Sequence, residues 1–279
     1  MILNSQIASL VDPIRLIRYP GGKQRILQFI LPYLPSREMI KGKYIEPFLG
    51  SGAVFFALNP YRAVLSDINR DLIDLFRGVK RYPREIWRIY VNFPKDKASY
   101  YRIRDKEDNK KGLAFRAAKL LYLNRTCFKG MWRQNSDGKF NIGYGGLDRV
   151  WVINEESLNM VSKRLKKALL ICSDFEETIE KGKRDDFIFL DPPYKPGAKD
   201  LLHSHYLHNK FRFEDYVRLA KVLERASDRG VKWAMTISSH PEILKLFKIK
   251  SNIYKIPKGT GKRPGSLIFN SGEVLICNY

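Results

Sequence analysis

An aspartate, two prolines and a tyrosine follow one another directly after the apolar run 187–190. The prolines, Pro192 and Pro193, lack N–H groups and have a fixed φ, so the backbone there is rigid and offers only carbonyl acceptors. Asp191 adds a carboxylate acceptor, and Tyr194 adds a ring on which a flat molecule can stack. Together these groups can hold an exocyclic amino group by its hydrogens and turn its nitrogen lone pair toward an electrophile. The alternative is an ordinary proline turn beside a buried tyrosine.

Apolar runs and helical periodicities alternate along the chain around this motif. The first part predicts a helix over 23–34, a strand leading into Glu46, a helix from 52, a strand over 61–65 and a helix from about residue 69. The pattern resumes with a helix over 155–167, a strand over 168–172, a short helix after 174, the strand 187–190, a helix over 213–228 and a strand over 231–237. Such alternation is typical of an α/β fold with a parallel sheet covered by helices. Two last strands, 249–256 and 273–278, have no helix between them and predict an antiparallel hairpin that closes the sheet.

A stretch of different character interrupts the alternation over residues 82–150. Its first part is helical, notably over 113–123, and its second part, 124–146, is rich in glycine and asparagine, so we expect an inserted lobe. Between residues 75 and 150 the chain has 19 lysines and arginines against 7 acidic residues, together with 13 aromatic residues. Cations mixed with rings favour a surface that binds phosphates and stacks on bases. The alternative is a solvated basic face over an ordinary aromatic core.

The whole chain carries a net charge of +22, and a second basic stretch runs from 245 to 263. Such an excess favours a polyanionic partner, usually nucleic acid. A membrane is not favoured, because the sequence has no basic amphipathic helix, no apolar run of transmembrane length and no signal-peptide pattern. The three scattered cysteines argue against a disulfide framework or a zinc site and indicate a cytoplasmic location.

The turn 46–52 lies between a strand and a helix, where ligands bind in an open parallel sheet. Its glycines let the backbone approach a ligand, and Asp67, at the end of the next strand, can accept hydrogen bonds from both hydroxyls of a ribose. A dinucleotide fingerprint would need a third glycine where Phe55 stands, and no P-loop lysine follows. We therefore predict a nucleoside without pyrophosphate, S-adenosylmethionine, with Glu46 attracting its cationic end and Lys23 pairing with its carboxylate. An ordinary turn is the alternative for the glycines alone.

Five segments carry a resemblance through their order in the chain: 19–23, 46–52, 66–69, 174–175 and 191–194. With an inserted lobe between the third and the last, the chain resembles the Dam-type DNA adenine-N6 methyltransferases, the D12 class or α-group. The resemblance spans nearly the whole chain. It implies a seven-stranded methyltransferase sheet in a catalytic domain of residues 1–75 and 151–279, and a mostly helical DNA target-recognition domain of residues 76–150.

The resemblance also implies residue roles. Tyr19 and Lys23 would contact the methionine end of the cofactor, although the family more often has Trp-Ala where this chain has Tyr19-Pro20. Asp67 would hold the ribose and Ile68 would pack on the adenine. The remaining cofactor residues would be Glu46, Phe48, Gly50, Ser51 and Gly52 along the turn, Asp174 and Phe175 at the adenine edge, and Asp191. Asp191, Pro192, Pro193 and Tyr194 would serve the target base.

The segment after residue 123 is similar to the family's target-recognition segment. The residues implied to contact DNA are Asn124, Arg125, Phe128, Lys129, Arg133, Asn135, Lys139, Asn141 and Gly143. Family members specific for GATC carry asparagine where this chain has Lys129 and proline where it has Gly143, whereas Arg133, expected to read a guanine, is retained. We therefore expect a short recognition sequence other than GATC.

The predicted reaction is methyl transfer from S-adenosylmethionine to N6 of an adenine in duplex DNA, with the base flipped out of the helix at a cost of a few kcal/mol. Methylation of cytosine N4, methylation of an RNA base, and a non-catalytic nucleic-acid-binding module remain alternatives. The predicted partner is double-stranded DNA, with a cognate restriction endonuclease as a possible second one; the oligomeric state stays open.

Three histidines, His203, His205 and His208, follow the motif. They could suggest a metal site, but no carboxylate stands at a suitable spacing beside them, so we predict no metal. The region 197–209 has little apolar periodicity, and we expect a loop that closes over the flipped base.

Overall fold

The computed structural model describes residues 14–106, 111–135, 138–147, 153–193, 211–247, 252–258 and 268–279. The predictions for Tyr194 and for the loop with His203, His205 and His208 concern residues outside this description. Within it, no helix combines the length and the apolar character that crossing a membrane requires.

Seven strands form one sheet. They are β1 (Tyr44–Glu46), β2 (Ala63–Asp67), β3 (Ala168–Cys172), β4 (Phe187–Leu190), β5 (Lys232–Ser238), β6 (Asn252–Lys258) and β7 (Ile268–Cys277). Their order is β3-β2-β1-β4-β5-β7-β6. The first five in this order pair in parallel, whereas β7 runs antiparallel to both β5 and β6. The predicted seven-stranded α/β fold with a C-terminal antiparallel hairpin is confirmed.

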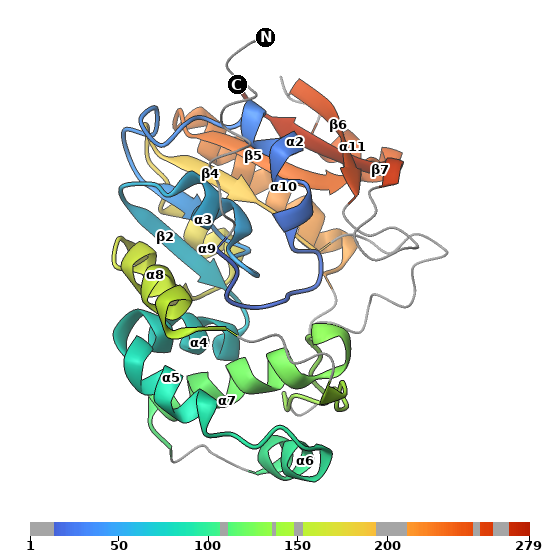
Figure 1. The fold of residues 1–279 in the computed structure, drawn as a ribbon. Helices are drawn as coiled ribbons and strands as arrows, with labels where there is room; N and C mark the ends of the chain where they lie inside the picture. The colour runs from blue at the N-terminus through green and yellow to red at the C-terminus, as the bar shows by residue number, and fades with distance from the viewer. Residues whose placement is uncertain are drawn as a thin grey trace.

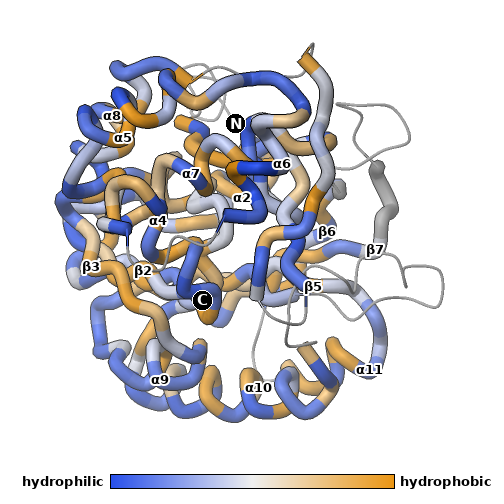
Figure 2. Tube along the Cα trace, turned by 90° about the horizontal axis from the view of Figure 1, so that it is seen from below, coloured by the Kyte–Doolittle hydropathy of each residue, from blue (hydrophilic) through white to orange (hydrophobic). Residues whose placement is uncertain are grey.

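The central strands contribute side chains to two cores, one on each face of the sheet. In β4, Phe187 and Phe189 belong to one core, and Ile188 and Leu190 belong to the other. All four are buried, as expected for a strand covered on both faces. One face is covered by α9 (Phe175–Glu180), α10 (Phe213–Asp228) and α11 (Pro241–Leu244), and the other by α2 (Leu27–Ile30), α3 (Ala53–Leu58), α4 (Arg70–Arg81) and α8 (Glu155–Leu165). Figure 2 shows the sheet between these two helical layers.

The inserted helices gather below the sheet in Figure 1: α5 (Pro83–Val91), α6 (Lys97–Asp105) and α7 (Leu113–Thr126). They join the sheet through α4, whose apolar side packs on α7. A Cβ atom on Gly78 of α4 would lie only 2.5 Å from the Cβ of Ala117, so the two helices approach closely because this residue is glycine. The predicted domain boundary after residue 75 falls inside α4, whose buried residues share one core with the sheet and the inserted helices.

The predicted helix over 23–34 is divided into three short pieces: a 3-10 turn over Lys23–Arg25, then α2, then a 3-10 turn over Leu31–Tyr33. Ile26 has φ −115° and ψ 10°, outside the helical region, and Pro32 lacks the N–H group that a continuing helix needs. The break places Lys23 on a tight turn. The other predicted elements occur with ends shifted by a few residues.

Candidate active site at the carboxyl edge of the sheet

Three acidic residues lie at the carboxyl ends of neighbouring strands. Glu46 ends β1, Asp67 ends β2, and Asp191 directly follows β4. Strand β1 lies between β2 and β4, and the chain builds the sheet outward in opposite directions from it, so the strand order reverses here. Open α/β sheets bind ligands outside the strand ends at such a point. The fold therefore brings the two main predicted motifs together.

Asp191 is held by side chains from two other parts of the chain. Its Oδ1 atom lies 2.7 Å from Lys23 Nζ and accepts a 2.8 Å hydrogen bond from Thr236 Oγ1 of β5. Two residues further on, the Pro193 carbonyl accepts a 2.5 Å hydrogen bond from the Tyr216 hydroxyl of α10. These contacts fix residues 191–193 at both ends.

Lys23 is buried, and oxygen atoms from three of the described residues surround its ammonium group. Nζ donates to the Gly21 carbonyl at 2.9 Å and lies 2.7 Å from Asp191 Oδ1 and 3.4 Å from Glu273 Oε1. Burial alone lowers the pKa of a lysine, but the attraction of the two carboxylates outweighs burial and raises the pKa of Lys23. In the structure, the partners of Lys23 are therefore groups of the protein itself. The sequence predicts the carboxylate of the cofactor as its partner.

Glu46 is a buried carboxyl group with a tyrosine partner. The Tyr44 hydroxyl donates to Glu46 Oε2 at 2.8 Å. Burial raises the pKa of Glu46 well above its usual range, and the nearby charges of Asp191 and Asp67 add to the increase. Glu46 therefore ionises less readily than an ordinary glutamate, which weakens its predicted attraction for a cationic ligand.

Asp67 joins the turn after β1 to the turn after β2. Its Oδ2 accepts the N–H of Gly50 at 3.0 Å, and its Oδ1 accepts the N–H of Asn69 at 2.9 Å. Burial raises the pKa of Asp67 to about 6, although both N–H groups favour the charged form. Gly50 has a φ of +48°, and a Cβ atom there would lie 3.3 Å from the ring of Tyr19. Both the backbone conformation and this close approach therefore favour glycine.

The turn 19–22 packs against the same place. Gly22 donates its N–H to the Tyr19 carbonyl at 3.1 Å, and a Cβ atom on Gly22 would lie 3.2 Å from Ser51 Oγ. Gly52, with a φ of +68°, precedes α3. The turn that begins at Tyr19 and the turn that contains Ser51 and Gly52 therefore pack against each other.

Aromatic rings lie beside this turn. Phe48 and Phe175 stack with ring centroids 5.4 Å apart, and Phe211 contacts both rings. Phe175 is buried at the start of α9, so the rings join the loop after β1 to that helix.

Asp174 and Ile68 flank these rings in sequence. Asp174 caps α9 by accepting the Glu176 N–H at 2.9 Å, and the same oxygen lies 2.8 Å from Arg218 Nη2. Ile68 follows Asp67 and has 54% of its surface exposed, which leaves an apolar side chain accessible at the strand end.

Asn124 and Arg125, which are predicted to contact DNA, are both buried in the structure. Asn124 accepts the Arg18 N–H through Oδ1 at 2.9 Å and donates to the Arg18 carbonyl through Nδ2 at 2.8 Å. Arg125 Nη2 donates to the Arg15 carbonyl at 2.8 Å and to the Leu16 carbonyl. Burial lowers the pKa of Arg125 to about 9. Both side chains are buried because they hold the segment 15–18 in place.

Phe128 and Lys129 form an exposed tip after α7. Lys129 has a φ of +55°, and its Nζ lies 5.2 Å from the centroid of the Phe128 ring. The backbone is fixed because the Phe128 N–H donates to the Gly143 carbonyl at 2.8 Å.

The remaining predicted DNA contacts lie on a narrow pairing of two chain segments. Arg133 Nε donates to Asn141 Oδ1 at 2.8 Å, which orients the guanidinium group. Asn135 Oδ1 accepts the Lys139 N–H at 2.9 Å, and the Lys139 side chain is exposed. The asparagines therefore shape the segment, while Arg133 and Lys139 carry its charge.

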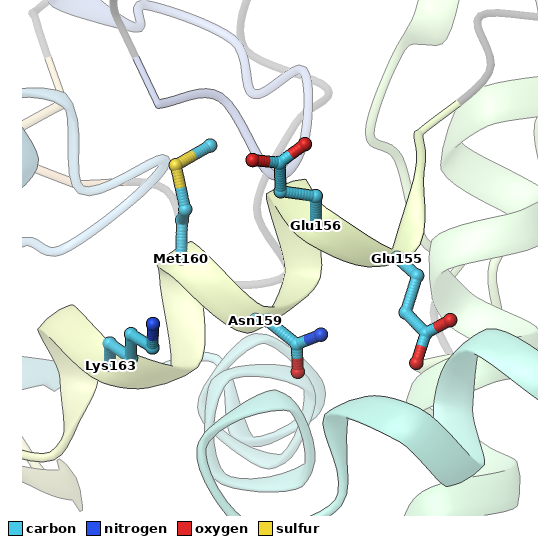
Figure 3. A pocket seen from close by; sticks show the side chains of 5 residues that line it. All are labelled: Glu155, Glu156, Asn159, Met160 and Lys163. Carbon is cyan, nitrogen blue, oxygen red and sulfur yellow. The ribbon is translucent and has the colours of Figure 1, made fainter.

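A surface pocket lies on α8, away from these residues. Its lining comes from this one helix: Glu155, Glu156, Asn159, Met160 and Lys163 (Figure 3). None of the predicted site residues lines it, and we assign it no part in the site. Among the residues described, no cluster of three or more histidine, cysteine or acidic side chains could hold a metal ion.

Three residues of the site were not predicted: Thr236, Tyr216 and Glu273. Thr236 and Glu273 are buried polar residues within or beside apolar strand runs. A buried polar side chain needs a partner, so this pattern could have drawn attention to both. Tyr216 lies at an apolar position of α10, where its ring gives no signal for the hydroxyl contact.

Known proteins are similar in sequence to this chain over most of its length. The family model described as D12 class N6 adenine-specific DNA methyltransferase matches residues 19–262. A type II methyltransferase of Methanocaldococcus jannaschii is 34% identical over 289 residues, covering 94% of this chain and 98% of the relative. A type II methyltransferase of Lactococcus lactis subsp. cremoris is 30% identical over 271 residues, covering 94% of each chain. A DNA adenine methylase of Vibrio cholerae is 32% identical over 230 residues, covering 80% of each chain.

Proposed function

Because the chain belongs to the D12 class N6 adenine-specific DNA methyltransferases, which transfer a methyl group from S-adenosylmethionine to adenine in DNA, we propose that Asp191 and the Pro192 carbonyl hold the target amino group. The observation that carries this proposal is the place of Asp191 at the reversal of strand order, with Oδ1 fixed by Lys23 and Thr236. Tyr194 would stack on the flipped base, since its ring follows the rigid prolines.

We assign S-adenosylmethionine to the turns beside Asp191. When bound, it supplies a methyl group on a cationic sulfur. Asp67 would accept the ribose hydroxyls and Ile68 would pack on the adenine; a carboxylate beside an exposed apolar side chain fits these two parts of the molecule. The adenine edge would meet Asp174 and Phe175. Tyr19, Glu46, Phe48, Gly50, Ser51 and Gly52 would line the remainder of the site.

The chemistry requires the N6 lone pair to point at the methyl carbon. A nitrogen–carbon bond forms while the carbon–sulfur bond breaks, its electron pair stays on sulfur, and N6 then loses one proton. Asp191 would accept a hydrogen bond from an amino hydrogen and so orient the lone pair, and that proton would leave through the same hydrogen bond. The acceleration would come mainly from this orientation, with the placement of charge assisting.

On the DNA side, we propose that Arg133 reads a guanine, because Asn141 orients its guanidinium group. Phe128, Lys129, Lys139 and the Gly143 backbone would form the rest of the recognition segment. Lys129 has an ammonium where GATC-specific relatives have asparagine, which supports a recognition sequence other than GATC.

The domain roles follow from the same reasoning. Residues 76–150 would form the DNA target-recognition module, and residues 1–75 with 151–279 would form the catalytic module, joined through α4. Two relatives are named type II methyltransferases, which supports a cognate restriction endonuclease acting on the same sequence. Because the substrate is DNA and the three cysteines are free thiols, we place the protein in the cytoplasm.

The test is nucleoside analysis of duplex DNA treated with the purified protein and methyl-labelled S-adenosylmethionine. We expect N6-methyladenine from the wild type and from the control Asp228→Ala, which removes an exposed carboxylate at the end of α10. Asp191→Ala should lose more than about 100-fold in methylation rate while DNA affinity is kept. N4-methylcytosine as the product, methylation of RNA alone, or full activity of Asp191→Ala would contradict the proposal. Sequencing with modified-base detection gives the recognition sequence from the same DNA.

A further inference from the structure

Glu273 reaches the site from the opposite end of the chain to Lys23. Because β7 runs antiparallel to β5, its residue 273 pairs with Ser238, at the carboxyl end of β5. Strand β4 ends on this same side of the sheet, and Asp191 directly follows it. Because β7 is antiparallel, Glu273 lies within the strand and still reaches the side of the sheet where the parallel strands end.

The backbone before Glu273 is fixed. Gly272 has a φ of +73°, and its carbonyl accepts the Ser239 N–H at 2.5 Å. A Cβ atom on this glycine would lie 3.3 Å from Ser239 Oγ. Glu273 itself is 7% exposed, so its side chain is buried and extends from a backbone whose position is fixed.

Glu273 is one of the oxygen acceptors around the ammonium group of Lys23. An ammonium has three N–H donors, and in the described part of the chain the Gly21 carbonyl, Asp191 Oδ1 and Glu273 Oε1 lie within reach of them. A buried cation with fewer partners would move or draw in water, because burial of a charge is costly unless it is paired. The position of the ammonium therefore depends on Glu273 as well as on Asp191.

We propose that Glu273 is a positioning residue for methyl transfer: it fixes the ammonium of Lys23, which in turn fixes Asp191 Oδ1 at the target amino group. The inference rests on the proposed role of Asp191. Glu273 acts through Lys23 and does not touch the target base.

The experiment is a double-mutant cycle on the full chain, measured as the single-turnover methylation rate with saturating DNA and S-adenosylmethionine. Glu273→Gln keeps the shape and one oxygen but removes the charge, and we expect a rate about 10- to 100-fold lower. In the Lys23→Met background, the same substitution should change the rate by less than about twofold, because the residue it acts through is absent. Glu273→Asp should recover part of the rate. Glu38→Gln, which breaks an exposed ion pair with Arg37, is the matched control and should leave the rate unchanged.

Each outcome bears on the proposal. An unchanged rate in Glu273→Gln overturns it, and so does an equal loss in the wild-type and Lys23→Met backgrounds. Thermal unfolding of every variant identifies loss of structure, and if Glu273→Gln is unfolded at the assay temperature, the comparison is made with Glu273→Asp in the two backgrounds. Full activity of Asp191→Ala would remove the proposed site itself. An inactive Asp191→Ala with a fully active Glu273→Gln would remove only the positioning role.

Discussion

The carboxyl ends of the parallel strands and the proposed recognition segment, residues 124–135 and 138–147, hold their proposed functional side chains in different ways. At the edge, Asp191 is fixed by Lys23 and Thr236, which lie far from it in sequence. In that segment, Arg133 is oriented by Asn141, eight residues away, through a half-buried pairing of two loop segments. The first arrangement cannot change without disturbing the core, whereas the second can change locally.

Under the proposed function, this difference separates chemistry from specificity. The residues proposed for methyl transfer lie at the ends of strands whose positions the whole fold determines. The exposed tip with Phe128 and Lys129 is held by backbone hydrogen bonds within the loop and to Gly143, so under the proposal a new residue there would alter the base that is read without altering the sheet. Substitutions in the two regions should therefore have effects of different kinds.

Lys23→Met should have the largest effect on stability. It leaves Asp191 and Glu273 beside each other without their shared cation, and breaking a buried ion pair costs about 3 kcal/mol or more. Urea unfolding measures the loss in the free energy of unfolding. A loss below about 1 kcal/mol would mean that the ion pairs of Lys23 contribute no more to stability than exposed ion pairs do. The contrast between the two regions would then be contradicted.

Arg133→Ala should affect recognition and leave the fold intact. A bidentate arginine–guanine contact contributes about 1–3 kcal/mol of discrimination, so methylation of the preferred sequence relative to single-base variants should fall correspondingly. Its free energy of unfolding should stay within about 0.5 kcal/mol of the wild type. Methylation rates on a set of duplexes measure the first quantity, with Arg62→Ala as the control. Unchanged discrimination would exclude Arg133 as the base-reading residue.

The affinity for S-adenosylmethionine should depend on the charge of Asp67. Its pKa of about 6 means that the carboxylate is mostly protonated below that pH and charged above it. Ribose hydroxyls need the charged form as acceptor, so affinity should rise by up to about tenfold from pH 5 to pH 7. Calorimetry at a series of pH values measures this rise. The dependence should be much weaker in Asp67→Asn, and an identical profile in that variant would assign the titration to another group, such as Glu46.

Arg218→Gln should have the smallest effect. Arg218 contacts Asp174, Glu176 and Asp215 within 3.1 Å, but its side chain is 43% exposed. Exposed ion pairs contribute about 0–1 kcal/mol each, so the free energy of unfolding should fall by less than about 1 kcal/mol. A loss as large as that of Lys23→Met would show that the number of ion pairs, and not their burial, determines the stability of the site.

The sequence predicts most of the sheet, because strand and helix periodicities are strong where both faces of the sheet are covered. It also predicts the order of the motifs, and the fold brings Glu46, Asp67 and Asp191 to one edge. The contact of Lys23 with Glu273 could not be predicted, because it depends on the direction of β7 in the sheet. The burial of Asn124 and Arg125 could not be predicted either, because polar residues at the end of a helix look the same whether they face DNA or the backbone of a distant segment.

If Glu273 positions Lys23 as proposed, their contact also ties methylation to the synthesis of β7. The first partner emerges from the ribosome early and the second only when β7 has been made. Contacts between residues so far apart in the chain form late, since the intervening segment must close first. A nascent chain that already carries the turns for the cofactor would still lack its complete set of charges, so methylation would begin only after the last strand has joined the sheet.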